Sequence, residues 1–378
     1  MKFPPARSGS PVKISKREIA FSFFPMRKEE RRWGIHTEIY AANPWAVILD
    51  SASQISKGAD QKAAQSFVRQ AQEFFKAAQN ASSIESPPLL YYYSFLNLAK
   101  ALAITKGRSE LVGGVTHGIN VVGGTEHTVK NAHIETKRTQ AKPNGTKKVS
   151  AVDELHHALE GKPVTATTIP IHTVVPQSVV GHRMWLSASK GRRERFLPIR
   201  KVQLVSDPSA KQIWAQIFIE KAALSVINYP LKDVLARSIA DGSFQTVADI
   251  DIDGVPHRVF EQKTPVVYAD RVGDEVMTVV NHVKPFLWQT VTSTPPYRRY
   301  YLYLCPASET ALPQWLSTYL TLFWLGSLTR YQPVELLKLF ESPLGGFFRE
   351  FLVTQPGQLL YTLASEFKSQ DVCKAAVV

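Results

Sequence analysis

Residues 89–102 read LLYYYSFLNLAKAL, and this stretch decides how both ends of the chain are expected to fold. On a helical wheel, four apolar residues share one narrow stripe that is typical of a core face: Tyr91, Phe95, Leu98 and Leu102. A second stripe on nearly the opposite side carries Tyr93, Asn97 and Lys100. A solvent-facing stripe would carry more charge, so we expect this one to face a cleft or another helix. Buried Asn and Lys need polar partners, so the stripe is either an inter-helix contact or part of a ligand-binding cleft.

Helices are expected to include this stretch, to precede it, and to form again near the end of the chain. Ser86 and Pro87 favour a helix start and Gly107 a stop, which predicts a helix over 87–106. Apolar residues at three- and four-residue spacing predict an amphipathic helix over 59–79. Further helices are expected after residue 313. The uncharged stretch 310–329 could span a membrane by length, but polar residues recur along it, so we expect a buried helix and no membrane partner.

The middle of the chain reads as strands. The residues Asp253-Gly254 separate two alternating segments and predict a hairpin, whereas residues 211–227 are expected to form a helix. The predicted fold is α+β, with N- and C-terminal helices forming one bundle and a β-rich middle region inserted between them. We expect four parts: a basic N-terminal arm (1–42), N-terminal helices (43–109), the β-rich region (110–309) and C-terminal helices (310–378).

Composition favours an anionic partner. The chain has 45 Lys and Arg against 32 Asp and Glu, a formal net charge of +13, which suits nucleic acid, nucleotides or a membrane surface. Only two cysteines are present, Cys305 and Cys373, and they are far apart. Their spacing predicts no metal site and no disulfide framework, and indicates a reducing cytoplasm. The N-terminus lacks the apolar core of an export signal. No cofactor is expected.

Three segments together carry a family resemblance: PPLLYYYSFLNLAKAL, THGIN and STYLTLFWLGSLTRYQP. They resemble the YaaC-like family of bacterial proteins over roughly the first third and the last quarter of the chain. The resemblance implies a bacterial cytoplasmic protein but no specific chemistry. Its shared residues fall at Tyr92, Tyr93, Asn97, Lys100, His117, Gly118, Arg330, Tyr331 and Pro333.

The helix over 87–106 is also similar to the paired-tyrosine helix of HEPN domains, helical bundles often tied to RNA cleavage or defence. The nuclease branch needs an Arg followed four to six residues later by a His. Arg31 and His36 have that spacing, but they precede the bundle, and we do not interpret them as catalytic. The resemblance then implies a binding or dimerisation module, within a defence or stress-response assembly.

The candidate ligand-binding cleft comprises Tyr93, Asn97, Lys100, His117, Arg330 and Tyr331. His117 lies in a Gly-rich stretch whose backbone amides could approach a phosphate, or it is a turn residue. Arg330 ends an uncharged helix, where a cation suits the helix C-terminus. The alternative is that Arg330 and Tyr331 approach the stripe and complete an anion-binding pocket.

Two patterns in the middle region are typical of metal sites. The residues Asp249, Asp251, Asp253 and Gly254 begin like an EF-hand loop, but the closing glutamate is missing. Asp251, Glu261 and Lys263 resemble a nuclease motif in which carboxylates hold Mg²⁺. A two-residue turn would place Asp251 and Glu261 on opposite faces, and only a bulged turn would bring them together.

Two basic patches are candidates for nucleic-acid binding. The first patch contains Arg192, Arg193 and Arg195. The second contains Arg299 and Tyr301, with Tyr297 and Tyr303 on the same strand face. Arginine pairs with phosphates and tyrosine stacks on bases; the alternative is a solvated loop and an ordinary half-buried strand.

The sequence therefore predicts a binding or interaction protein for an anionic ligand, with single-stranded nucleic acid favoured. One alternative is a metal-dependent nuclease using Asp251, Glu261 and Lys263. Another is a structural subunit that binds a protein partner or forms a homo-oligomer. Enzymatic activity is not expected.

Overall fold

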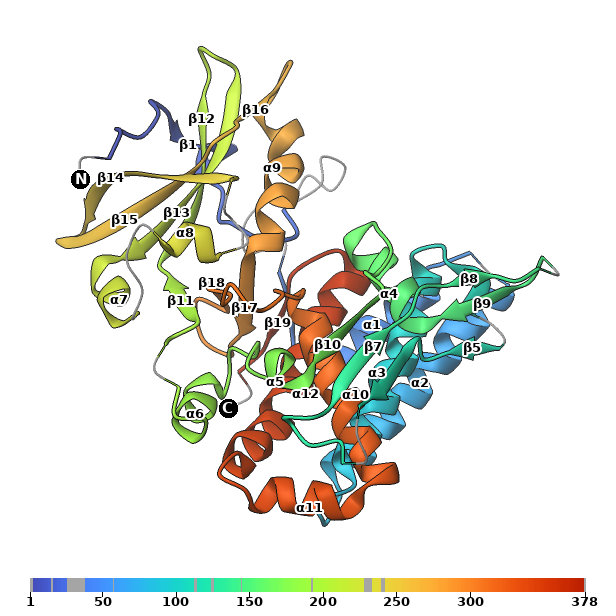
Figure 1. Ribbon diagram of the computed structural model, residues 1–378. Helices are drawn as coiled ribbons and strands as arrows, with labels where there is room; N and C mark the ends of the chain where they lie inside the picture. The colour runs from blue at the N-terminus through green and yellow to red at the C-terminus, as the bar shows by residue number, and fades with distance from the viewer. Residues whose placement is uncertain are drawn as a thin grey trace. The chain divides into compact units, whose positions relative to one another are not determined.

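In the computed structural model, the described residues are 3–14, 16–25, 38–56, 58–111, 114–123, 126–143, 145–191, 193–227, 233–238 and 242–376. The chain forms two compact units (Figure 1). The first unit consists of Met1–Tyr40, Lys190–Ala311 and Ser369–Val378, and the second of Ala41–Ser189 and Leu312–Lys368. Both units contain helices and strands, so the predicted mixture of α and β structure is confirmed.

The first unit is built on a six-stranded antiparallel sheet of order β1-β12-β13-β15-β14, with β16 beside β13. Its strands are β1 (Ser10–Pro11), β12 (Lys201–Asp207), β13 (Gln212–Glu220), β14 (Phe244–Ile252), β15 (Val255–Gln262) and β16 (Val266–Val267). A second sheet has the order β11-β18-β17, from β11 (Phe196–Ile199), β17 (Leu287–Val291) and β18 (Arg298–Tyr303). Shorter pairs join β2 (Lys13–Ile14) to β3 (Arg17–Glu18), and β4 (Ile39–Ala41) to β19 (Val372–Lys374). The helices are α7 (Lys221–Val226), α8 (Asp233–Arg237) and α9 (Val276–Val283).

The predicted helix over 211–227 is wrong, because most of this segment is the central strand β13, and only its end forms α7. From Ile213 to Ile219 every residue of β13 is buried. A strand paired on both sides and covered on both faces carries a continuous apolar run, which periodicity alone does not distinguish from a buried helix.

The hairpin at Asp253-Gly254 is confirmed. Both residues have positive φ, 53° and 79°, as a two-residue turn between twisted strands requires. Ile252 pairs with Val255 and Asp251 with Pro256, and β14 then carries an irregularity between Val247 and Ile250.

The second unit contains the helices from both ends of the chain: α1 (Pro44–Ser53), α2 (Ala59–Gln79), α3 (Pro87–Thr105), α10 (Gln314–Tyr331), α11 (Pro333–Glu341) and α12 (Gly345–Lys368). The boundaries predicted for α2 are confirmed, and those for α3 hold to within one residue. Helix α3 packs against α2, α10, α4 and α12, and its neighbours lie around it in Figure 1. No helix among the described residues is long and apolar enough to cross a membrane.

The rest of the second unit includes two small sheets and three short α-helices among the described residues. The sheets have the orders β10-β7-β6 and β5-β9-β8. Their strands are β5 (Val115–Thr116), β6 (Ile119–Val122), β7 (His133–Thr136), β8 (Gln140–Ala141), β9 (Lys147–Ser150) and β10 (Thr167–Pro170). The helices are α4 (Ala151–Glu160), α5 (Ile171–Val174) and α6 (His182–Ala188).

Helices α3 and α10 approach each other closely at Gly326. A Cβ at this position would lie 3.4 Å from both the Leu89 Cα and the Tyr92 Cβ, so the absence of a side chain lets α10 pack directly on the start of α3. Residues one turn before and after Gly326 therefore face α3 as well. This contact places Phe323 and Arg330 beside the tyrosines of α3.

Candidate anion-binding site

The two stripes of α3 differ in burial as the sequence predicts. The core stripe of Tyr91, Phe95, Leu98 and Leu102 is buried. In the second stripe, Tyr93 and Lys100 are half-buried and Asn97 is only 8% exposed. Its neighbours include the aromatic rings of α2: the Tyr93 and Phe74 ring centroids are 5.7 Å apart, and the Lys100 Nζ lies 5.2 Å from the Phe67 ring centroid. The polar stripe therefore faces other helices and not bulk solvent.

Arg330, at the end of α10, reaches this stripe. Its Nη1 donates a hydrogen bond of 2.8 Å to the Tyr93 hydroxyl. Its guanidinium carbon also lies 4.8 Å from the ring centroid of Tyr331, which is 66% exposed. Arg330 is itself exposed, so the contact with Tyr93 extends the stripe to the protein surface.

His117 approaches the same stripe from the loop between β5 and β6. Its Nδ1 forms a hydrogen bond with the Tyr92 hydroxyl, and the two rings stack at 5.6 Å. The next residue, Gly118, has a φ of 72°, and a Cβ there would lie 1.8 Å from the Ser150 Oγ. A side chain is therefore excluded at Gly118, and the turn that presents His117 depends on this glycine.

The surroundings shift the pKa values of three of these groups. Burial raises the pKa of Tyr92 well above its ordinary value, so the phenol stays protonated. Burial, together with the charges of Lys100 and Arg330, lowers the pKa of His117, and burial lowers the pKa of Lys100. The hydrogen bond with the Tyr92 hydroxyl engages the Nδ1 of His117 and leaves Nε2 for other partners. In the tautomer in which the phenol donates to Nδ1, the ring proton is on Nε2 and His117 presents a hydrogen-bond donor there.

We call Lys100, His117 and Arg330 the basic cluster. Among the described residues, no carboxylate forms an ion pair with any of the three, and the Asn97 amide has no hydrogen-bond partner. Lys100 and Arg330 are both close enough to His117 to shift its pKa. Lys100 is half-buried, and a cation that is partly removed from water is normally paired with an acid. The basic cluster therefore has donors and positive charge for an anion that the protein itself does not supply.

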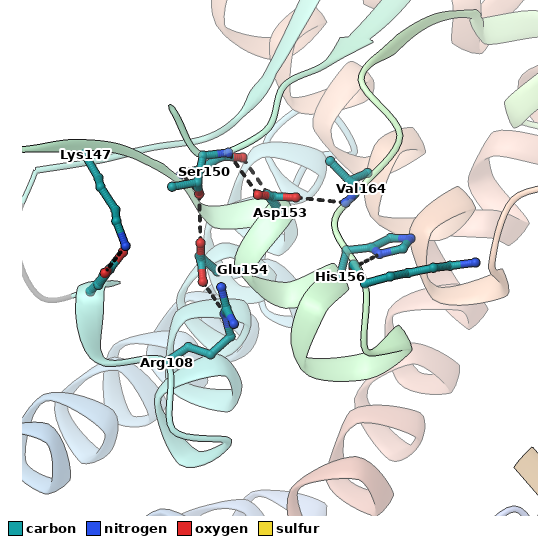
Figure 2. A network of polar contacts seen from close by, with 10 residues as sticks. Arg108, Lys147, Ser150, Asp153, Glu154, His156 and Val164 are labelled. Atoms are coloured by element: carbon teal, nitrogen blue, oxygen red, sulfur yellow. Dashed lines mark hydrogen bonds and ion pairs between the residues drawn. The ribbon is translucent and has the colours of Figure 1, made fainter. Parts of the chain in front are cut away.

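A second polar group in the same unit, drawn in Figure 2, has the opposite character. We call Arg108, Thr139, Ser150, Asp153 and Glu154 the α4 network. Asp153 accepts hydrogen bonds from the Thr139 and Val164 amides at 2.9 and 2.8 Å, while the Thr139 hydroxyl donates to Glu154 at 2.8 Å. The Arg108 guanidinium forms an ion pair with Glu154.

The α4 network supports the loop that carries His117. Ser150 caps α4 by accepting from the Asp153 amide at 3.3 Å, and its hydroxyl donates to the Lys137 carbonyl at 2.7 Å. The Val152 amide then donates to the His117 carbonyl at 3.4 Å. The start of α4 thus holds the His117–Gly118 turn in position.

The structure does not bring the predicted nuclease residues together. Because Asp251 pairs with Pro256, it shares a face with the even-numbered residues of β15, and Glu261 points to the other face. Asp251 is exposed near the turn and accepts from the Gly254 amide at 2.7 Å, whereas Glu261 is fully buried and pairs with Gln245. The irregularity in β14 falls before Asp251 and does not change its face. The described part of the chain contains no group of three or more His, Cys, Asp or Glu that could hold a metal ion.

The structure leaves only part of the predicted basic patches open to a partner. Arg192 lies outside the described residues, as do Arg31 and His36, and Arg193 is exposed. Arg195 forms two hydrogen bonds with Glu309, of 2.7 and 2.9 Å, so its guanidinium is already occupied by an internal carboxylate and leaves the predicted patch.

The strand β18 carries the remaining residues of these patches. Arg299 is exposed and Tyr301 is half-buried. Tyr303, on the same face, is buried against Phe196 and Trp288. Only the Arg299 end of this face is therefore open to a partner.

Sequence reasoning missed Tyr92 and Phe323 as parts of the site. Tyr92 was noted only as a shared family residue, yet it holds His117, and its ring centroid lies 5.1 Å from that of Phe323. The signal was the spacing of Tyr319, Phe323, Gly326 and Arg330, which places them along one face of α10.

A comparison with protein families finds the family model described as YaaC-like Protein over residues 34–367. The chain belongs to the YaaC-like family. The match includes the middle region, so the predicted restriction of the resemblance to the two ends is corrected. No curated protein and no solved structure matches this YaaC-like chain.

Proposed function

We propose that the second unit binds an anionic ligand at the basic cluster, and that this ligand is a phosphate group of single-stranded nucleic acid. The observation that carries the proposal is the convergence of Lys100, His117 and Arg330 with no acidic partner among the described residues. An anion would supply the missing counter-charge and accept hydrogen bonds from all three side chains.

The surroundings of the cluster favour phosphate on a nucleic acid over an isolated inorganic anion. Tyr331 exposes its ring beside Arg330, and Tyr93 is half-buried next to the same guanidinium. Proteins that bind single strands combine cations that contact the backbone with aromatic rings that stack on bases. The net charge of +13 adds a long-range attraction for a polyanion.

The chemistry of His117 supports binding without cleavage. A general base needs a ring nitrogen that is free to accept a proton from the substrate. The Nδ1 of His117 is already engaged by the Tyr92 hydroxyl, and in the tautomer with the proton on Nε2 the imidazole acts as a donor toward a ligand. We infer that the cluster recognises the anion and does not activate a nucleophile.

We also infer that the helices from the two ends of the chain act as one bundle, with Lys190–Ala311, the later part of the predicted β-rich region 110–309, as an insertion. The contacts of α3 with α10 and of α1 with α12 support this arrangement. In this arrangement α3 supplies the centre of the ligand site and α10 its outer edge.

The test is binding of a fluorescent single-stranded RNA of about 12 nucleotides to protein purified through a high-salt wash. With two cationic contacts, from Lys100 and Arg330, the logarithm of the Kd should rise with the logarithm of salt concentration with a slope of about 1.4. Lys100→Met and Arg330→Met should each weaken binding by about tenfold or more. Lys130→Met, which removes an exposed charge from the same unit, is the matched control and should change the Kd by less than about twofold.

Equal losses in the Lys130 control and the two cluster variants would show that the net charge alone attracts RNA. Absence of any binding after the high-salt wash would remove the nucleic-acid proposal. If inorganic phosphate or pyrophosphate then binds, and this binding is weakened by the two cluster variants but not by the Lys130 control, the cluster is an anion site whose ligand is not a nucleic acid.

A further inference from the structure

The N-terminal segment Phe3–Val12, which we call the arm, crosses one face of the large sheet in the first unit. The Ala248 amide donates to the Pro4 carbonyl at 2.8 Å, and β1 within the arm pairs with β12. Ala6 packs on a small apolar group of this face, Phe218, Val247 and Val259. Residues with the opposite alternation, such as Ile217 and Phe260, face the core that contains α9. The part of the arm around Ala6 therefore covers the sheet face opposite α9, whereas Val12 at its end is buried in the core that contains α9.

Arg7 is the residue of the arm that the sheet holds most specifically. Its Nη1 donates to the Gln262 carbonyl at 2.7 Å, and its Nη2 donates to the Lys263 carbonyl. Its backbone amide donates to the Glu261 Oε2 at 3.1 Å, and its guanidinium carbon lies 5.7 Å from the Trp214 ring centroid. Two carbonyls, one carboxylate and one indole thus surround an arginine.

The carboxylate in this group is built into the sheet. Glu261 is 0% exposed, and its partner in register on β13, Gln216, donates from Nε2 to the Glu261 Oε2 at 2.9 Å. Trp214 lies two residues before Gln216 and faces the same side. Strand pairing places these side chains on the face that the arm crosses.

The arm leaves part of this site unsatisfied. The Glu261 Oε1 has no hydrogen-bond partner, and the nearest guanidinium nitrogen, Nη1 of Arg7, is 3.8 Å away. The Trp214 Nε1 is also buried without a partner. Unsatisfied buried polar atoms are unfavourable, so a ligand that offers a donor to Glu261 and an acceptor to Trp214 would bind better than the arm does.

We propose that this sheet face is a docking site for an extended peptide that carries an arginine, and that the arm occupies it as a displaceable internal ligand. A guanidinium can form two parallel hydrogen bonds with a carboxylate, which would satisfy the Glu261 Oε1. The peptide backbone supplies carbonyl acceptors for the Trp214 Nε1 and further strand pairing at the sheet edge. This assignment gives Glu261 a role without a metal and does not depend on the basic cluster.

The test uses full-length protein and a fluorescent peptide with the arm sequence FPPARSGSPV. The Arg7→Ala protein, whose own arm is weakened, should bind this peptide about tenfold tighter than the wild-type chain does. A peptide with citrulline in place of arginine keeps the shape and loses the charge, and it should bind about tenfold more weakly. Adding Glu261→Gln to the Arg7→Ala protein should reduce binding in the same way.

The matched control is Lys13→Ala, which removes an exposed positive charge just after the arm and should leave peptide binding as in the wild-type chain. The proposal is overturned if the Arg7→Ala protein keeps the wild-type circular dichroism spectrum and does not bind the peptide. The proposal is also overturned if the Arg7→Ala protein binds the citrulline peptide as tightly as the arginine peptide.

A second experiment applies if Arg7→Ala prevents folding. A protease site inserted at the exposed Lys16, in the turn between β2 and β3, allows the wild-type arm to be cut from the folded protein. Excess arginine peptide should then release the cut fragment, and excess citrulline peptide should not. A fragment that stays bound under excess arginine peptide shows that the arm is a permanent part of the sheet and contradicts the proposal.

Discussion

The α4 network and the basic cluster lie in the same unit and meet at the His117–Gly118 turn, but their charges are balanced in different ways. In the α4 network, the buried carboxylates of Asp153 and Glu154 accept from backbone amides, a hydroxyl and a guanidinium. In the basic cluster, two cations and an imidazole donor have no carboxylate beside them among the described residues.

This difference separates polar groups that stabilise the fold from polar groups available to a ligand. Removing a satisfied buried group leaves its partners without hydrogen bonds and destabilises the protein. Removing an unpaired, partly desolvated cation relieves an unfavourable charge and affects stability little. Mutations in the two regions should therefore have opposite consequences for stability and for binding.

The largest effect on stability is expected for Asp153→Ala. The substitution leaves the Thr139 and Val164 amides without acceptors at a site that is 3% exposed, which should lower the free energy of unfolding by about 3 kcal/mol. Urea-induced unfolding measures this loss. Glu73→Ala, which removes an exposed carboxylate, should cost less than about 0.5 kcal/mol. A loss below about 1 kcal/mol for Asp153→Ala would mean that the α4 network is not a stabilising element.

Gly118→Ala, at the junction of the two regions, should have the next largest effect. Its Cβ would overlap the Ser150 Oγ and the backbone φ is positive, so we expect a loss of about 2–4 kcal/mol, together with weaker anion binding as His117 moves. Gly145→Ala has a similar φ of 78° with open space around it and should cost only about 1 kcal/mol. Equal costs at the two glycines would show that the Ser150 contact does not constrain the turn.

Local patterns in the sequence predict some features of the structure, whereas contacts between distant residues are not predicted. Local signals place α2 and α3 within a residue of their ends, and they place the Asp253-Gly254 hairpin. The contact of Arg330 with Tyr93 joins residues 237 positions apart. It depends on the approach of α10 to α3 at Gly326; the spacing along α10 indicates which face is used but not which helix packs on it.

The errors of the sequence analysis have a common physical cause. The segment containing β13 reads as a helix because both of its faces are buried, and Arg195 reads as a free cation because Glu309 lies 114 residues away in sequence. Glu261 resembles a metal ligand in the sequence because the partners of its carboxylate, the Gln216 side chain and the Arg7 amide, lie 45 and 254 positions away. In each case a long-range partner determines the environment of the residue.

Lys100→Met should change stability only slightly, and in the favourable direction. Burial lowers the pKa of Lys100 and no acid among the described residues pairs with it, so an apolar side chain of similar length should be tolerated or should stabilise the fold by up to about 1 kcal/mol. The urea unfolding used for Asp153→Ala measures this change as well. A loss of more than about 1 kcal/mol would place Lys100 among the stabilising groups and remove the contrast between the regions.

The smallest expected effect is a pH dependence from His117. Its pKa in the folded protein is lowered, so the unfolded chain binds the proton more readily and stability falls as pH drops below the ordinary histidine value of about 6.5. Between about pH 7.5 and about pH 5.5, the wild-type Tm should fall by about 1 °C more than that of His117→Gln. Equal falls would show that His117 is not desolvated in the folded protein.

An anion bound at the cluster would raise the pKa of His117, because the negative charge of the anion favours the imidazolium. RNA affinity should therefore rise as pH drops from about 7.5 to about 5.5 in the wild-type chain, and rise less in His117→Gln. Affinity that is independent of pH in both proteins would place the bound anion away from His117.

The most direct test of the central claim measures RNA binding and Tm on the same Lys100→Met sample. If the basic cluster is a ligand site, the Kd for single-stranded RNA rises by about tenfold or more while the Tm stays equal to that of the wild-type chain or increases. If the Tm drops by several degrees and the Kd is unchanged, Lys100 stabilises the fold and the account of the cluster is wrong.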